Sequence, residues 1–108
     1  MHLRSGELEL AERQTRHAIE MLDGRVDYLY EIGMATIVLG RALLGQGRLD
    51  DAEQAFADAE TSFEQLSSVS HTALAWTARG DLALERGDDR AAGELFRRAA
   101  EALQENVF

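Results

Sequence analysis

Residues 39–56 read LGRALLGQGRLDDAEQAF, and this stretch decides the fold. Gly47 is suited to end a helix, because glycine adopts the left-handed backbone at little cost. Asp50 is placed to cap the helix that follows, and Glu53, three residues later, completes a capping-box pattern. The stretch therefore predicts a tight turn between two antiparallel helices.

Two further passages resemble this one. They begin at Gly6 and Gly87, so that the three glycines recur at an almost equal interval along the chain. Alanines follow each glycine at matching offsets, in the series Ala11, Ala52, Ala92 and the series Ala18, Ala59, Ala99. Self-similarity at a fixed period of this length is typical of a stacked array of helical hairpins.

The pattern of apolar residues predicts five helices and no strands. After Gly47, apolar residues recur every three or four positions in one stripe, as on a helix with one buried face. Gly24 and Asp27 delimit an earlier element, and Ser70 is expected to cap a later one. Proline is absent from the sequence. We expect an all-α domain with helices near residues 6–22, 27–46, 49–67, 70–86 and 89–105.

These residues resemble the tetratricopeptide repeat, which has an aromatic, a Leu-Gly pair, a turn glycine, and then Ala, an aromatic and Ala. The first full repeat matches through Leu39, Gly40, Leu43, Gly47, Ala52, Phe56 and Ala59, and the second through Trp76, Gly80, Gly87, Ala92, Phe96 and Ala99. The resemblance implies a short right-handed superhelix within 1–108: a partial repeat at 1–24 and repeats at 25–67 and 68–108. It also implies a core position for Trp76.

The chain departs from the family pattern in three ways. Thr36 replaces the aromatic in one repeat, and Arg79 replaces the leucine in the other. The period, about 40 residues, also exceeds that of the family, which is about 34 residues. We expect the extra residues around 67–70. Residues 39–56 and 75–88 resemble the repeats of actinobacterial transcriptional regulators, which implies a fragment of a longer bacterial regulator.

The composition of the chain argues against several classes of function. The net charge of −9 disfavours direct binding of nucleic-acid phosphates. The longest mostly apolar run, residues 32–40, is too short to cross a bilayer, and no export signal opens the sequence. Cysteine is absent, which agrees with a cytoplasmic location.

No pattern of catalytic, metal-binding or cofactor-binding residues stands out. Gly40, Gly45 and Gly47 are spaced somewhat like a phosphate-binding loop, but its lysine and its preceding strand are missing, so a helix-ending turn is favoured. The histidines lack the spacing of helical metal ligands, and adjacent Ser70 and His71 cannot face each other. The three histidines are His2, His17 and His71.

Acidic residues are many, and a pair of carboxylates is a candidate for acid–base catalysis only if its environment separates the two pKa values. We instead place Glu53, Glu60, Glu94 and Glu101 on solvated helix faces, near arginines 90, 97 and 98. At the start of one helix, Tyr28 or Tyr30 is expected to face solvent or a partner.

The resemblance implies a concave groove that binds a protein or peptide. Its residues would be Met34, Ile37, Val38, Arg41 and Leu44 from one repeat, and Leu74, Thr77, Asp81 and Glu85 from the next. Lysine and asparagine do not stand at these positions, which disfavours a clamp for carboxy-terminal carboxylates. An apolar half and an acidic half suit a helix or peptide with an apolar stripe and a basic end.

A second hypothesis is self-association. Helix 6–22 has no hairpin mate to cover its apolar face, and repeat arrays normally end in polar caps. A homodimer would cover that face, which carries Ala11, Ala18, Ile19 and Leu22.

Overall fold

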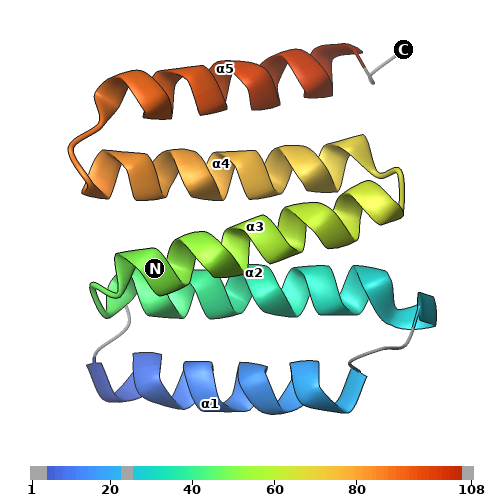
Figure 1. Cartoon of the computed structure of the whole chain (residues 1–108), viewed down its shortest axis with the longest axis vertical. Coiled ribbons are helices and arrows are strands. Elements are labelled where there is room, and N and C mark those ends of the chain that lie inside the picture. Colours follow the sequence, from blue (N-terminus) through green and yellow to red (C-terminus); the bar gives the residue numbers. More distant parts are fainter. Residues whose placement is uncertain (1–4, 23–25, 106–108) are drawn as a thin grey trace.

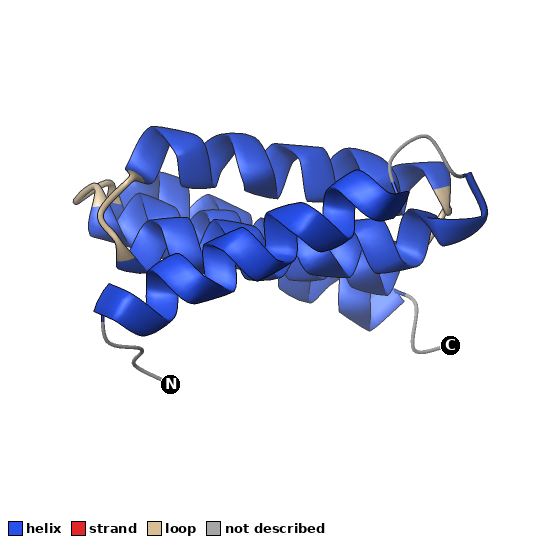
Figure 2. Ribbon diagram, turned by 90° about the horizontal axis from the view of Figure 1, so that it is seen from below, coloured by secondary structure: helices blue, strands red, loops and turns tan. Residues whose placement is uncertain are grey.

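The computed structural model describes residues 5–22 and 26–105, which form an antiparallel stack of helices (Figure 1). The elements are α1 (Ser5–Leu22), a 3₁₀ turn η1 (Val26–Tyr28), α2 (Leu29–Gly45), α3 (Leu49–Gln65), α4 (Val69–Glu85) and α5 (Asp89–Glu105). No strand occurs in these ranges, so the predicted all-α class is confirmed. Seen from below, the helices pack side by side with their turns at the two ends (Figure 2).

Helices α2 to α5 have the same length and begin at equal intervals along the sequence. Each has 17 residues, and their first residues, Leu29, Leu49, Val69 and Asp89, follow one another at equal intervals. The prediction that the extra residues lie around 67–70 is therefore wrong. They are shared among all the helices, because the usual hairpin of the family, about 34 residues long, holds two shorter helices with their turns.

The three turns between these helices share one backbone conformation. Gly47, Ser67 and Gly87 have positive φ, at 76°, 54° and 77°. After each of them, an amide donates a hydrogen bond back across five residues, as from Arg48 N to Leu43 O and from Asp88 N to Ala83 O. This is the Schellman pattern that satisfies the last carbonyls of a helix. The predicted role of Gly47 and Gly87 is confirmed.

Helix α1 begins at Ser5, one residue before the start at Gly6 expected from the sequence. Two sequence-based predictions about helix ends are wrong. Asp50 does not cap α3: Arg48 is the N-cap residue, and the Asp50 carboxylate accepts a hydrogen bond from Arg86 at 2.7 Å. Ser70 lies inside α4, whose N-cap residue is Ser68. Because α3 and α4 begin directly after their turns, these two caps fall earlier than sequence spacing suggested. Gly24 lies outside the described residues.

The core runs between the hairpins. It consists of large side chains from α2 and α3 and alanines that let α4 approach, namely Ile37, Leu39, Leu43, Ala52, Ala55, Phe56, Ala59, Phe63, Ala75, Ala78 and Leu82. Phe56 and Phe63 are completely buried. Ala92 and Ala99 are buried too, whereas Phe96 remains partly exposed, because no described helix covers the far side of α5.

A glutamate near the start of one helix accepts hydrogen bonds from the turn at the end of the following helix, and this contact occurs in two successive repeats. Glu12 of α1 accepts hydrogen bonds from Gln46 at 3.1 Å and from Arg48 at 2.8 Å. Glu53 of α3, in the same place one repeat later, accepts one from Arg86 at 3.2 Å. Hydrogen bonds from Arg16 first, and also from Gln46 and Arg48, lower the pKa of Glu12 to about 2.

Two predicted placements are corrected where α3, α4 and α5 meet. Glu60 does not lie on a solvated face: it accepts hydrogen bonds from Trp76 Nε1 at 2.6 Å and Arg79 at 2.8 Å, and its side chain is 15% exposed. Trp76 is only partly buried, and the Arg98 guanidinium lies 4.3 Å from its ring centroid. The arginine in the family's leucine position thus supplies a partner for Glu60.

Glu94 and Glu101 of α5 lie on exposed faces beside arginines, as the sequence suggested. Arg90 lies 3.9 Å from Glu94, and Arg97 lies 3.9 Å from Glu101. Both pairs are exposed and add little to stability.

Candidate functional site

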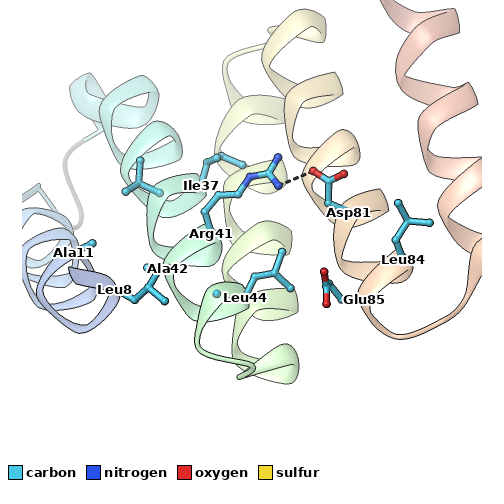
Figure 3. A pocket seen from close by; sticks show the side chains of 11 residues that line it. Leu8, Ala11, Ile37, Arg41, Ala42, Leu44, Asp81, Leu84 and Glu85 are labelled. Carbon is cyan, nitrogen blue, oxygen red and sulfur yellow. Dashed lines mark hydrogen bonds and ion pairs between the residues drawn. The ribbon is translucent and has the colours of Figure 1, made fainter. Parts of the chain in front are cut away.

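A cleft of about 630 Å³ opens between α1, α2 and α4 (Figure 3). Helix α2 forms its floor, and α1 and α4 form its two sides. The residues that line it are Leu8, Ala11, Ile37, Val38, Arg41, Ala42, Leu44, Gly45, Asp81, Leu84 and Glu85.

The α1 side of the cleft depends on a close approach of two helices. Leu8 is buried and lies against Gly45, where an added Cβ would come within 3.0 Å of the leucine methyl groups. A side chain at position 45 would displace the Leu8 side chain or push α1 away from α2. Glycine at this position therefore lets Leu8 pack closely on α2 at this side of the cleft.

An ion pair crosses the cleft. Arg41 of α2 donates a hydrogen bond to Asp81 of α4 at 2.5 Å, and the two residues occupy the same position in successive repeats (Figure 3). Their side chains are 41% and 37% exposed. A pair this accessible to water contributes little to stability, so it is free to exchange partners when another charged group enters the cleft.

The rim of the cleft is apolar. Val38 is 50% exposed and Leu84 is 48% exposed, while Leu44, the equivalent of Leu84 one repeat earlier, is partly exposed. Ile37 is buried below them and contributes to the core. Exposed apolar side chains gathered around a concavity are characteristic of a binding surface rather than of the general protein surface.

The cleft has an excess of negative charge. Because Arg41 neutralises Asp81, the carboxylate of Glu85 remains as the net charge among the lining residues. Within the described part of the chain, Glu85 makes no ion pair. A cationic group would therefore be favoured at this end of the cleft.

The cleft contains six of the nine residues predicted for the groove: Ile37, Val38, Arg41, Leu44, Asp81 and Glu85. The other three lie elsewhere. Met34 packs against the core, the Thr77 hydroxyl donates to the Ala73 carbonyl at 3.0 Å, and Leu74 is partly buried on α4.

Sequence reasoning missed five lining residues. Leu8 and Ala11 were missed because the groove was assigned to the first helix of each hairpin, whereas α1 is a second helix. The sequence could have indicated Leu84, since this residue stands one repeat after Leu44, which was predicted to line the groove. Ala42 and Gly45 complete the list, and no pattern in the sequence indicated that they line a groove.

The described histidines, His17 and His71, and the two tyrosines lie outside the cleft. His71 contacts the rings of Tyr30 and Phe63, and its Nδ1 lies 2.5 Å from Ser68 Oγ. His17 is exposed on α1, and His2 is outside the described residues. Tyr28 and Tyr30 are both exposed, at 38% and 45%. Across residues 5–22 and 26–105, no cluster of three potential metal ligands forms.

None of the described helices is both long enough and apolar enough to span a bilayer. This finding agrees with the apolar runs in the sequence, the longest of which fell short of a span.

Comparison with known proteins identifies the family. The model of the tetratricopeptide repeat matches residues 2–67 and again residues 37–106, so that the two matches overlap and together span nearly all of the chain. No curated protein and no solved structure matches it. The tetratricopeptide repeat is a non-catalytic scaffold that mediates protein–protein interactions. The chain therefore belongs to the tetratricopeptide-repeat family.

Proposed function

We propose that this chain is a protein- or peptide-binding scaffold and that the cleft between α1, α2 and α4 is its binding surface. The observation that carries the proposal is the apolar rim: Val38 and Leu84 are about half exposed on either side of the Arg41–Asp81 pair. Burial of such side chains by a partner is favourable by about 25 cal/mol per Å² of apolar area. The proposal assigns the chain binding rather than catalysis.

The chemistry of the cleft favours an amphipathic helix or peptide with one basic residue. An apolar stripe would cover Val38, Leu44 and Leu84, in the manner of a helix lying in a groove. A lysine or arginine at one end of the stripe would approach Glu85, and it would also compete with Arg41 for Asp81.

A fluorescence-anisotropy titration tests this proposal. The probes are labelled amphipathic peptides with leucine every third or fourth residue and a terminal arginine, and matched peptides that end in glutamate. We expect the basic peptides to bind more tightly. Leu84→Glu should weaken binding at least about tenfold, because it places a charge against the apolar stripe.

Leu66→Glu is the matched control. Leu66 is 39% exposed and lies in the turn after α3, outside the cleft. Equal losses in the two variants, or binding that neither variant changes, would remove the cleft from the proposal. Glu85→Gln tests the charge separately, since it should reduce only the preference for the basic peptide.

We further propose that the scaffold serves as the cytoplasmic sensing or interaction part of a bacterial transcriptional regulator. The resemblance of residues 39–56 and 75–88 to the repeats of such regulators supports this context. Sequencing the gene in its native genome tests it. A DNA-binding or nucleotide-binding domain encoded in the same chain is expected, and a reading frame without either would contradict the proposal.

Self-association through α1 is the second candidate function. Leu10 and Met21, which are 47% and 65% exposed, favour it. Four other residues were assigned to this surface from the sequence: Ala11, Ala18, Ile19 and Leu22. They contribute less, because all four are only partly exposed and Ile19 packs against the core. Loss of a dimer in Met21→Glu, measured by sedimentation, would support this function, and an unchanged dimer would contradict it.

A further inference from the structure

Helix α5 lies at the edge of the stack, and within the described residues no helix covers its outer side (Figure 1). Comparison with α3, which occupies the same place one repeat earlier, shows which side chains of α5 remain exposed. Phe56 and Phe63 of α3 are fully buried. Their equivalents in the next repeat differ, because Phe96 is partly exposed and Leu103 is 44% exposed.

Helix α5 lacks the carboxylates by which α3 holds α4. In α3, Glu53 binds Arg86, and Glu60 binds both Trp76 and Arg79. The residues at these two positions of α5 are Gly93 and Ala100. The face therefore does not repeat the polar contacts of an internal hairpin junction. It offers instead an apolar surface on which another helix backbone can approach closely.

This surface is one stripe with alternating sizes. Gly93, Phe96, Ala100 and Leu103 are spaced three and four residues apart, so they lie on one side of α5. Small and large side chains alternate along it. If a second copy of α5 lies antiparallel and the two are aligned at residue 98, Gly93 faces Leu103 of the second copy. The exposed part of Phe96, whose ring also packs on Gly80 of α4, then faces Ala100 of that copy. In a two-fold interface the same surface of both copies meets, so that surface must be complementary to itself, as this stripe is.

Charge also favours a second copy at this place. The whole chain carries a net charge of −9, so most faces of two copies repel each other. Helix α5 is nearly neutral, because Arg90, Arg97 and Arg98 offset all but one of its four carboxylates. The antiparallel alignment brings Arg97 within one helical turn of Glu101 of the second copy, and two-fold symmetry forms this pair twice.

We propose that the chain forms a homodimer in which the two α5 helices pack antiparallel along the stripe Gly93, Phe96, Ala100 and Leu103. The opposite end of the stack is less suited to this contact. On α1, Leu10 and Met21 are separated on the same stripe by Gln14 and His17, which are both exposed. The dimer leaves the cleft between α1, α2 and α4 open, so the inference does not depend on the proposed function.

Sedimentation equilibrium from about 1 to 200 μM tests the proposal. The wild type should approach twice its mass of 12.0 kDa as the concentration rises. Ala100→Glu should raise the dissociation constant more than about tenfold, because it buries two unpaired carboxylates at the seam. Leu66→Glu also adds one negative charge, but in the turn after α3 and away from the stripe, and it should leave the dissociation constant unchanged.

Gly93→Gln separates dimerisation from folding. An added Cβ at Gly93 meets nothing within 4 Å, and glutamine is a better helix former than glycine. The variant should therefore melt at a higher temperature when dilute, yet dimerise at least about tenfold more weakly because its side chain meets Leu103 of the second copy. A wild type that stays monomeric throughout, or a dimer that Met21→Glu breaks while Ala100→Glu and Gly93→Gln do not, overturns the proposal.

Discussion

The ring of Phe56 lies directly on Gly40, so that two helices of one hairpin touch where a glycine of α2 faces an aromatic of α3. A Cβ on Gly40 would come within 3.0 Å of three ring atoms. The same relationship joins Gly80 of α4 to Phe96 of α5. The two pairs differ in one respect, because Phe56 is completely buried whereas Phe96 is partly exposed.

Gly40→Ala and Gly80→Ala should therefore differ in stability. The Phe56 ring has no space to move, so Gly40→Ala should lower the free energy of unfolding by about 1–3 kcal/mol. At Gly80 in the dilute, monomeric chain the Phe96 ring can shift toward solvent, and the gain in helix propensity of up to about 1 kcal/mol offsets most of the remaining cost. Urea unfolding followed by circular dichroism measures both. Equal losses would show that burial of the ring does not decide the outcome.

Ser67→Gly should stabilise the chain. Ser67 has a φ of 54°, a conformation that glycine adopts more easily than serine. We expect a gain of about 0.5–1 kcal/mol in the free energy of unfolding, after the greater entropy of glycine in the unfolded chain is deducted. The reverse change at the equivalent turn, Gly47→Ser, should cost a similar amount. Thermal melts of both variants check the signs, and a loss in Ser67→Gly would contradict the account.

Glu60→Ala should change the fluorescence of Trp76, the single tryptophan in the chain. The substitution leaves the indole N–H and the Arg79 guanidinium without their acceptor. The expected loss is about 1–3 kcal/mol in the free energy of unfolding, together with a red shift of the emission as water reaches the indole. Glu64→Ala, an exposed position on the same helix, should change neither quantity, and an equal effect there would rule out this role for Glu60.

The carboxylate of Glu12 should make the stability depend on pH in the acid range. Its pKa falls from an ordinary value of 4.5 to about 2, because Arg16, Gln46 and Arg48 donate hydrogen bonds to the ionised form. The stabilisation is therefore complete above about pH 4.5 and is lost as the pH falls through 2. Glu12→Gln should cost about 1–2 kcal/mol at neutral pH, since exposed arginines are partly screened by water.

The comparison that isolates Glu12 is the difference between wild type and Glu12→Gln. That difference should shrink from pH 5 to pH 2, and a carboxyl titration by nuclear magnetic resonance should place the pKa of Glu12 at about 2, well below its ordinary value of 4.5. A difference that is constant across this range would show that the hydrogen bonds of Glu12 do not distinguish its charged form.

The sequence predicted the fold well because its signals are local. Gly47 and Gly87 mark turns through a backbone conformation that other residues rarely adopt, and the buried alanines repeat with the helix period. Ser67 shows the limit of this reasoning. The turn that it forms is the same, but serine carries no such signal, and the helix start was placed at Ser70 instead.

The candidate site was predicted in part because a cleft depends on the packing of distant segments. Arg41 and Asp81 share a repeat position, so their proximity follows from the period. Leu8 was missed because its place depends on how closely α1 approaches Gly45. Glu60 was misplaced for a similar reason, since an acidic residue becomes buried only when Trp76 and Arg79 of the next helix surround it.

The regular spacing of helix starts at Leu29, Leu49, Val69 and Asp89 sets a rule for how such a chain can change length in evolution. Inserting or deleting a single helix with its turn would keep the spacing of the turns. It would also break the alternation between helices that carry the packing glycine, such as α2 and α4, and helices that carry the phenylalanine, such as α3 and α5. Phenylalanines would then meet phenylalanines where glycines are needed. Only duplications of a whole hairpin keep each glycine opposite an aromatic ring, and so the array can grow or shrink by complete hairpins alone.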